Sequence, residues 1–223
     1  MKACEPVHVQ FSYDDRGVAV VNDTFEAHQG LKVSAEVFDL DLKSRFAQTA
    51  SVDLAGDAVA RAFAVPALPG ISTTYFLRLR VDDAAGREVS SNFYWLSAKE
   101  DVLDWNKTKW YYTPTKSHAD LRALAQLPAT QLKVTSRVEA PGPEGRSRVT
   151  VENAGRALAF QVRLKLTDGA GGEELLPVYW EDNYFALMPG EKRELTVRYP
   201  APKGTPAVEA EAWNAPAVAA GAP

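Results

Sequence analysis

The sequence predicts an all-β chain: two tandem immunoglobulin-like antiparallel β-sandwiches joined by an aromatic connector with one short helix. Three observations lead to this prediction. Apolar and polar residues alternate through most of the chain, turn signals recur roughly every 8 to 12 residues, and a Val-x-Val-x-Asn motif occurs once in each half. With 223 residues the chain is long enough for two domains of about 100 residues each.

The first sandwich is expected over residues 1–98. Val7, Val9 and Phe11 alternate with polar neighbours up to a turn at residues 14–17, and the alternation then resumes at Val18. Seven strands are expected, over residues 7–11, 18–22, 31–37, 49–54, 59–65, 75–82 and 88–95. Seven short strands in about 100 residues are typical of an immunoglobulin-type sandwich.

The second sandwich is expected over residues 129–215, because the same order of features begins again. The motif Val149-Thr150-Val151-Glu152-Asn153 repeats the pattern of residues 18–22, and a short loop and a long alternating strand follow both copies. Further strands are expected at 132–138, 160–166, 193–199 and 208–213. Residues 216–223 are rich in Ala, Pro and Gly, so we expect a disordered tail there.

Another internal match joins residues 78–95 to residues 163–180, which align without gaps. Each segment carries an Asp-x-Ala-Gly turn, at 83–86 and 168–171, and each reads as a hairpin. The first hairpin closes its domain, whereas the second lies in the middle of its own. We attribute the match to similar demands on strand and turn rather than to equivalent position.

The connector, residues 99–128, contains the helix, which is expected over residues 117–127. Ser117-His118-Ala119-Asp120 has the form of a capping box, and Leu121, Leu124 and Leu127 then fall on one face before Pro128. A helix of about ten residues is unstable without packing. Its leucine face must therefore lie against a sandwich or against a partner.

Composition excludes several classes of function. A net charge of −4 gives no reason to expect binding to nucleic acid or to an anionic membrane, and we expect neither partner. No stretch approaches the roughly 18 apolar residues of a membrane helix. The single cysteine, Cys4, permits no internal disulfide, and the three histidines share no metal-ligand spacing. We expect no metal site and no cofactor.

No residue is a candidate for catalysis. The acidic pairs at 14–15, 82–83, 173–174 and 181–182 fall at expected hairpin tips, where carboxylates are solvated rather than directed into a cleft. The chain has no Gly-x-Ser-x-Gly motif and no glycine-rich phosphate loop before a helix.

The aromatic residues of the connector are the candidates for binding. Trp105, Trp110, Tyr111 and Tyr112 are poorly placed to be interior strand residues. Packing between domains is the interpretation that we favour for these four rings. Direct contact with a glycan is the alternative, because sugar-binding sandwiches present flat rings to the apolar faces of pyranoses.

Several motifs occur in and around the connector: NFYWLS at 92–97, DW at 104–105, WYYTP at 110–114, ADL at 119–121 and LP at 127–128. Together with KACEPVHVQ at 2–10, PVYWEDNY at 177–184 and LMPGE at 187–191, they resemble the carboxy-terminal region of family 2 glycoside hydrolases. The branch they resemble contains exo-β-D-glucosaminidases, β-mannosidases and mannosylglycoprotein endo-β-mannosidases.

The resemblance implies a non-catalytic part of a longer enzyme that hydrolyses β-mannosides or β-glucosaminides. In that family a (β/α)8 barrel carries two catalytic glutamates, and sandwiches follow it; none of the positions here corresponds to those glutamates. The implied partner is the catalytic barrel of the same polypeptide, with an oligosaccharide as a further candidate. An accessory carbohydrate-binding module is the alternative function. The chain alone does not fix a compartment, and for the parent enzyme we expect a periplasmic or secreted location.

Overall fold

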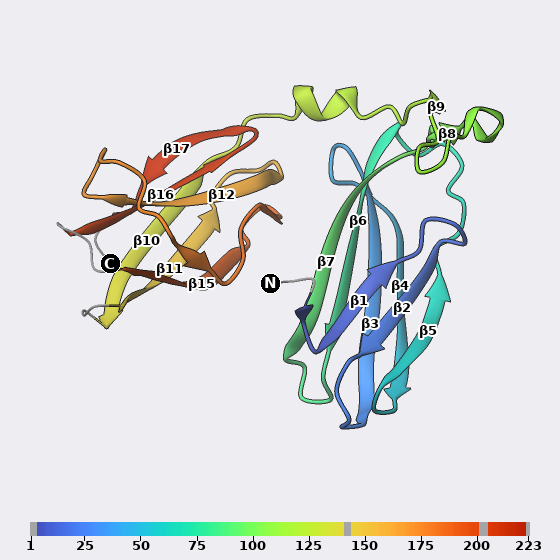
Figure 1. Cartoon of the computed structure of the whole chain (residues 1–223), viewed down its shortest axis with the longest axis horizontal. Helices are drawn as coiled ribbons and strands as arrows, with labels where there is room; N and C mark the ends of the chain where they lie inside the picture. Colours follow the sequence, from blue (N-terminus) through green and yellow to red (C-terminus); the bar gives the residue numbers. More distant parts are fainter. Residues whose placement is uncertain (1–3, 141–143, 201–204, 222–223) are drawn as a thin grey trace. The chain divides into compact units, whose positions relative to one another are not determined.

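The computed structural model describes residues 4–140, 144–200 and 205–221. The chain divides into two compact units, Lys2–Gln126 and Leu127–Pro223. Each unit contains two antiparallel sheets packed around its own apolar core (Figure 1). The predicted fold class, two tandem immunoglobulin-like sandwiches, is therefore confirmed.

The first unit is a sandwich of a three-stranded and a four-stranded sheet, ordered β1-β2-β5 and β4-β3-β6-β7. Its strands are β1 (Val7–Phe11), β2 (Gly17–Asn22), β3 (His28–Asp39), β4 (Ser44–Leu54), β5 (Ala58–Ala64), β6 (Thr74–Asp82) and β7 (Glu88–Ser97). A small extension follows, made of β8 (Val102–Leu103), the 3₁₀ helix η2 (Trp105–Lys107), β9 (Thr115–Ser117) and the 3₁₀ helix η3 (Arg122–Gln126).

The second unit pairs two four-stranded sheets, ordered β10-β11-β15-β13 and β14-β12-β16-β17. Its strands are β10 (Leu132–Ala140), β11 (Glu144–Asn153), β12 (Ala159–Asp168), β13 (Tyr179–Trp180), β14 (Phe185–Leu187), β15 (Lys192–Pro200), β16 (Pro206–Ala212) and β17 (Ala215–Ala219).

The alternation of the sequence places each core. In β3, Val33, Ala35 and Val37 are buried, and they lie in one core cluster with Leu77 and Leu79 of β6. Successive side chains of a strand point to opposite faces of its sheet, so this period of two puts every apolar residue of the set between the sheets. Figure 1 shows β1 and β2 lying over β3 and β6 in this unit.

The repeated asparagine motif has the same role in both units. Asn22 and Asn153 are almost fully buried at the ends of β2 and β11. Each Nδ2 donates to the carbonyl four residues ahead and to one distant carbonyl, and each Oδ1 accepts from the N–H two residues ahead. The carbonyls are those of Glu26 and Ala55 for Asn22, and of Ala157 and Leu187 for Asn153. A buried amide thus fixes the loop that leaves each strand.

The short helix begins at Arg122 rather than at residue 117, and it is a 3₁₀ helix. Ser117 does not cap it, because Ser117 lies in β9 and pairs with Val102 of β8. The N–H of Asp120 donates instead to the hydroxyl of Ser97, at 3.1 Å. The residues before Arg122 are held by the first sandwich, which removes the first turn expected of the helix.

Two further expectations are corrected by the sheet pairing. The hairpin expected over residues 163–180 forms only around its turn, where Thr167 and Glu174 make an antiparallel bridge. Beyond the turn the two arms separate, since β12 pairs with β14 and β16 while β13 pairs with β15 in the other sheet. The expected disordered tail contains β17, which pairs with β16; its residues 222–223 lie outside the described part of the chain. Alanine has a low strand propensity, so the sequence did not predict a strand there. The strand forms because the open edge of β16 offers hydrogen-bond partners to its backbone.

Candidate functional site

The four candidate aromatic residues lie on one structured loop, residues 104–114, which we call the aromatic loop. Its base is closed by the β8–β9 pair and by a hydrogen bond of 2.8 Å from the N–H of Asp104 to the carbonyl of Pro114. Nearer its tip, the backbones of Lys109 and Tyr112 exchange two hydrogen bonds of 2.9 Å each. The loop is therefore a small hairpin with a fixed backbone rather than a linker.

The side chains of this loop point into solvent. Their exposed fractions are 70% for Trp105, 92% for Trp110, 83% for Tyr111 and 59% for Tyr112. The Trp110 and Tyr111 rings meet edge to face, with centroids 4.5 Å apart and planes at 78°. Soluble domains seldom expose several large rings side by side, and such patches mark interaction surfaces.

The backbone at the tip of the loop is strained. Trp110 has φ = 47°, a left-handed conformation that bulky residues rarely adopt. It is the first of two residues between Lys109 and Tyr112, a position of tight hairpins at which glycine is favoured when φ is positive. Tryptophan is therefore unfavourable for the backbone at this position, which makes its exposed side chain a candidate for binding.

The end of the connector is attached to the first sandwich. The hydroxyl of Thr74, on β6, donates to the carbonyl of Asp120 at 3.0 Å, and the η3 helix contacts the same strand. The Asp120 carboxylate accepts from Nε and Nη2 of Arg122 at 2.9 and 2.8 Å. The hydrogen bonds from Arg122 hold the pKa of Asp120 far below its usual range. The sequence-based boundary at residue 98 stays a prediction, whereas the contacts divide the chain after Gln126.

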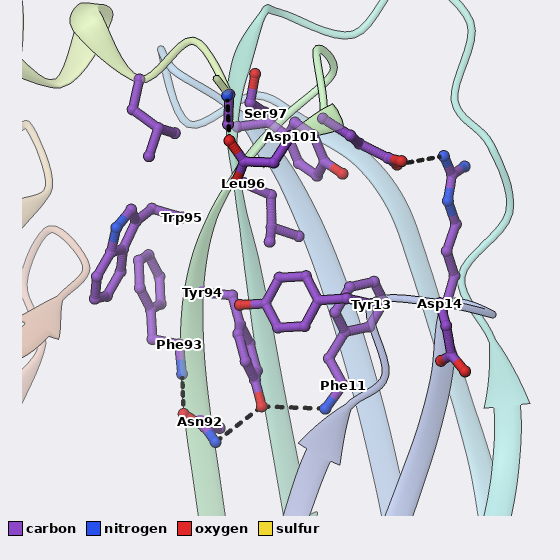
Figure 2. A pocket seen from close by; sticks show the side chains of 15 residues that line it. Phe11, Tyr13, Asp14, Asn92, Phe93, Tyr94, Trp95, Leu96, Ser97 and Asp101 are labelled. Carbon is purple, nitrogen blue, oxygen red and sulfur yellow. Dashed lines mark hydrogen bonds and ion pairs between the residues drawn. The ribbon is translucent and has the colours of Figure 1, made fainter. Parts of the chain in front are cut away.

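A groove of about 910 Å³ lies on the same sandwich, along the edge strand β7. We call it the aromatic groove. Figure 2 shows Tyr94 of β7 beside Phe11 and Tyr13, while Phe93 and Trp95 point to the other side of the strand. Ring centroids in the first group are 5.6 to 6.2 Å apart.

Polar groups of β7 fix the floor of the groove by closing the free edge of β1. The Tyr94 hydroxyl accepts from the N–H of Phe11 at 3.1 Å and from Nδ2 of Asn92 at 3.0 Å. Ser90, on the same side of the strand, accepts from the N–H of Val9 at 3.2 Å. Ser90, Asn92 and Tyr94, alternate side chains of β7, thus replace a backbone partner for β1, which also blocks pairing with another chain. Burial raises the pKa of Tyr94, so its hydroxyl stays neutral.

Charged groups line the rim of the groove: Asp14, Glu100, Asp101 and Arg16. Arg16 pairs with Glu100, with Nη2 and Oε1 3.4 Å apart. A hydrogen bond from the Ser12 side chain, together with backbone N–H groups, lowers the pKa of Asp14. With three carboxylates against one guanidinium, the rim is acidic.

The acidic pairs noted in the sequence do not come together in one cleft, although Asp14 lines the aromatic groove. Asp15, in the β1–β2 turn, pairs with Arg61 of β5, and Asp83 pairs with Arg87 in the β6–β7 turn. Over residues 4–140, 144–200 and 205–221, no three His, Cys, Asp or Glu side chains are grouped as a metal site would require. In the same ranges no helix has the length and apolarity needed to cross a bilayer.

Comparison with known proteins identifies the sequence family. Residues 110–215, from the tip of the aromatic loop to the start of β17, match the family model described as the exo-β-D-glucosaminidase Ig-fold domain. These residues belong to that family. The resemblance to family 2 glycoside hydrolases seen in the sequence is thereby confirmed.

Similarity to members of the family extends over both sandwiches. An exo-β-D-glucosaminidase of Streptomyces avermitilis is 42% identical over 96% of this chain and 24% of its own length. One from Arthroderma benhamiae is 35% identical over 86% of this chain and 22% of its own length. The crystal structure of the Amycolatopsis orientalis exo-chitosanase superposes with a TM-score of 0.92 and 38% identity, covering 98% of this chain and 26% of that one. The chain spans about a quarter of the length of these relatives.

The match to the Ig-fold family does not identify the residues of a site, whereas their geometry does. The structure groups all four residues selected from the sequence, Trp105, Trp110, Tyr111 and Tyr112, on one loop. No sequence pattern predicted the aromatic groove, which combines the β1–β2 turn, β7, Ala119 and Leu121. The signal available was Tyr13 just before an Asp-Asp-Arg-Gly turn, an aromatic residue where a polar one is usual.

Proposed function

We propose that the chain is the non-catalytic carboxy-terminal β-sandwich region of a family 2 glycoside hydrolase, and that it docks on and stabilises the catalytic (β/α)8 barrel of the same polypeptide. The parent enzyme hydrolyses β-glucosaminides or β-mannosides in this proposal, following the names of its relatives. The observation that carries the proposal is the aromatic loop: a closed hairpin that holds exposed rings away from the sandwich, with one of them at positive φ.

The geometry of the rings favours docking over sugar binding at this loop. Stacking along a row of pyranoses needs ring faces that are nearly coplanar, whereas Trp110 and Tyr111 stand at 78° to one another. Edge-to-face aromatic pairs are common in packed cores and at the buried centres of protein interfaces. Large rigid side chains that lose little conformational entropy are the usual anchors of such interfaces.

Relatives four times as long as this chain offer a partner for the loop. This chain covers 24% of the length of the Streptomyces avermitilis enzyme, so most of that protein lies outside the region compared. A docking surface that is part of the same polypeptide needs no high intrinsic affinity, because the linkage supplies a high effective concentration. A few exposed rings are then enough for docking on the barrel.

Two experiments test the proposal. The purified chain should not turn over an aryl β-glucosaminide or an aryl β-mannoside, and measurable turnover would contradict the non-catalytic assignment. In the longer gene product, Trp110→Ala should lower the melting temperature of the catalytic domain. The control is Phe25→Ala, since Phe25 is 95% exposed elsewhere on the same sandwich. Equal effects of the two substitutions, or no effect of either, would argue against docking through the loop.

The alternative is an accessory carbohydrate-binding module that uses Trp105, Trp110, Tyr111 and Tyr112. It predicts that oligosaccharide quenches the tryptophan fluorescence of the chain and that Trp110→Ala removes the quenching. Docking predicts that any such signal is unchanged by Trp110→Ala.

A further inference from the structure

We infer that the aromatic groove of the first sandwich binds a chain of β-linked glucosamine. The inference rests on the proposed function for the class of sugar, and on the groove alone for the place and the mode of binding. It assigns carbohydrate recognition to a part of the sandwich other than the aromatic loop.

The shape of the groove suits a short oligosaccharide. Its volume of about 910 Å³ lies within the usual range of small-molecule sites, about 300–1,000 Å³. Phe11, Tyr13 and Tyr94 line it beside one another, and Tyr13 is 68% exposed, so its ring is open to a ligand. Apolar rings with a few placed polar groups are the typical lining of ligand sites.

The floor of the groove is rigid before any ligand arrives. Tyr94 is held by two hydrogen bonds, from the N–H of Phe11 and from Asn92. Its ring also contacts those of Phe11 and Tyr13, with centroids 5.8 and 6.2 Å away. A preformed surface loses little entropy on binding.

Charge selects the amino sugar. The carboxylates of Asp14, Glu100 and Asp101 line the groove against one cationic group, Arg16, which pairs with Glu100. The lining therefore has a net negative charge and attracts positive charge. A protonated glucosamine amine can pair with a carboxylate of the rim, and an ammonium group is also attracted to the face of a tyrosine or tryptophan ring. Rings and carboxylates together therefore match a cationic sugar better than a neutral one.

The test is calorimetric titration of the whole chain with a β-1,4-linked glucosamine tetrasaccharide and, separately, with its fully N-acetylated counterpart. The inference predicts binding of the first and weaker binding of the second, because acetylation removes the positive charge. Tyr13→Ala should weaken glucosamine binding about tenfold, as expected for loss of one stacked ring. Glu100→Gln should weaken it about twofold to fivefold, as expected for an exposed ion pair.

Phe25→Ala is the matched control, since it removes a 95% exposed ring that belongs neither to the groove nor to the aromatic loop, and it should leave this binding unchanged. An unchanged unfolding midpoint for Tyr13→Ala verifies that the variant is folded. Absence of binding, equal affinity for the acetylated chain, or loss of binding in Trp110→Ala but not in Tyr13→Ala would each overturn the inference. Loss of binding in Trp110→Ala would favour the accessory carbohydrate-binding module over docking. The other results leave docking untouched, because docking is measured by the stability of the longer gene product.

Discussion

The hydroxyl of Tyr94 accepts a hydrogen bond of 3.1 Å from the backbone N–H of Phe11, and so joins the edge strand of one sheet to the edge strand of the other. The same oxygen accepts from Asn92. This contact closes an open strand edge and at the same time builds the floor of the aromatic groove. Stability and ligand binding therefore depend on one side chain at this position.

Tyr94→Phe should destabilise the first sandwich by about 1 kcal/mol, because it leaves a partly buried N–H without its acceptor while the ring stays in place. Urea unfolding monitored by hydrogen exchange and mass spectrometry, which resolves the two units, is the measurement. Tyr13→Phe is the control, since Tyr13 is mostly exposed, and should change stability by less than about 0.5 kcal/mol. Similar values for the two variants would show that the Tyr94 hydroxyl contributes nothing.

Asn22→Ala and Asn153→Ala should each lower the free energy of unfolding by about 3 kcal/mol. Each substitution leaves two carbonyls and an N–H without the hydrogen bonds that the side-chain amide made. Hydrogen exchange should rise in the first unit for one variant and in the second unit for the other. Asn106→Ala, at an exposed position of η2, is the matched control. Small losses of stability in both Asn22→Ala and Asn153→Ala would mean that the two motifs do not organise their loops.

The carboxyl of Asp120 should titrate well below the usual value of about 3.9, because Arg122 donates to both of its oxygens. The folded-state pKa is lower than the unfolded-state pKa, so this pair stabilises the chain above the unfolded-state value and the effect is lost as pH falls through the folded-state value. The carboxyl ¹³C chemical shift of Asp120 reports the midpoint. Arg122→Ala should return it toward the usual value, and a normal midpoint in the unmodified chain would contradict the structure.

Trp110→Gly should stabilise the isolated chain by about 0.5–1 kcal/mol, since glycine adopts positive φ without the steric penalty that tryptophan meets there. In the longer gene product the same substitution should lower stability, because the docking ring is lost. A gain in stability in the isolated chain together with a loss in the longer gene product is expected of a residue that serves an interface. A loss of stability in the isolated chain would show that the ring supports the loop itself.

Much of the fold could be predicted from the alternation of apolar and polar residues and from the turn residues between strands. The seven strands of the first unit follow alternation such as Val33-x-Ala35-x-Val37, and the turn at residues 83–86 brings β6 and β7 together as expected. The repeated Val-x-Val-x-Asn motif also predicted the repeated architecture, because the buried asparagine needs the same loop in both places.

The errors arose where tertiary contacts outweigh local sequence. Ser117 has the local pattern of a helix cap, but pairing with Val102 draws it into a strand. The hairpin expected over 163–180 is limited to the residues around its turn, because Tyr179 pairs with Arg198 in the other sheet. Likewise the groove unites Tyr13, Tyr94 and Leu121, which are far apart in the sequence, and no local pattern could have assembled it.

Solvent access to the tryptophans of the aromatic loop tests the docking proposal most directly. With 5-fluorotryptophan in place of tryptophan, the ¹⁹F solvent-isotope shifts of Trp105 and Trp110 can be compared between the isolated chain and the longer gene product, with resonances assigned by single substitutions. Docking predicts large shifts for both residues in the isolated chain, where they are 70% and 92% exposed, and small shifts in the longer protein. Equally large shifts in both proteins would contradict it.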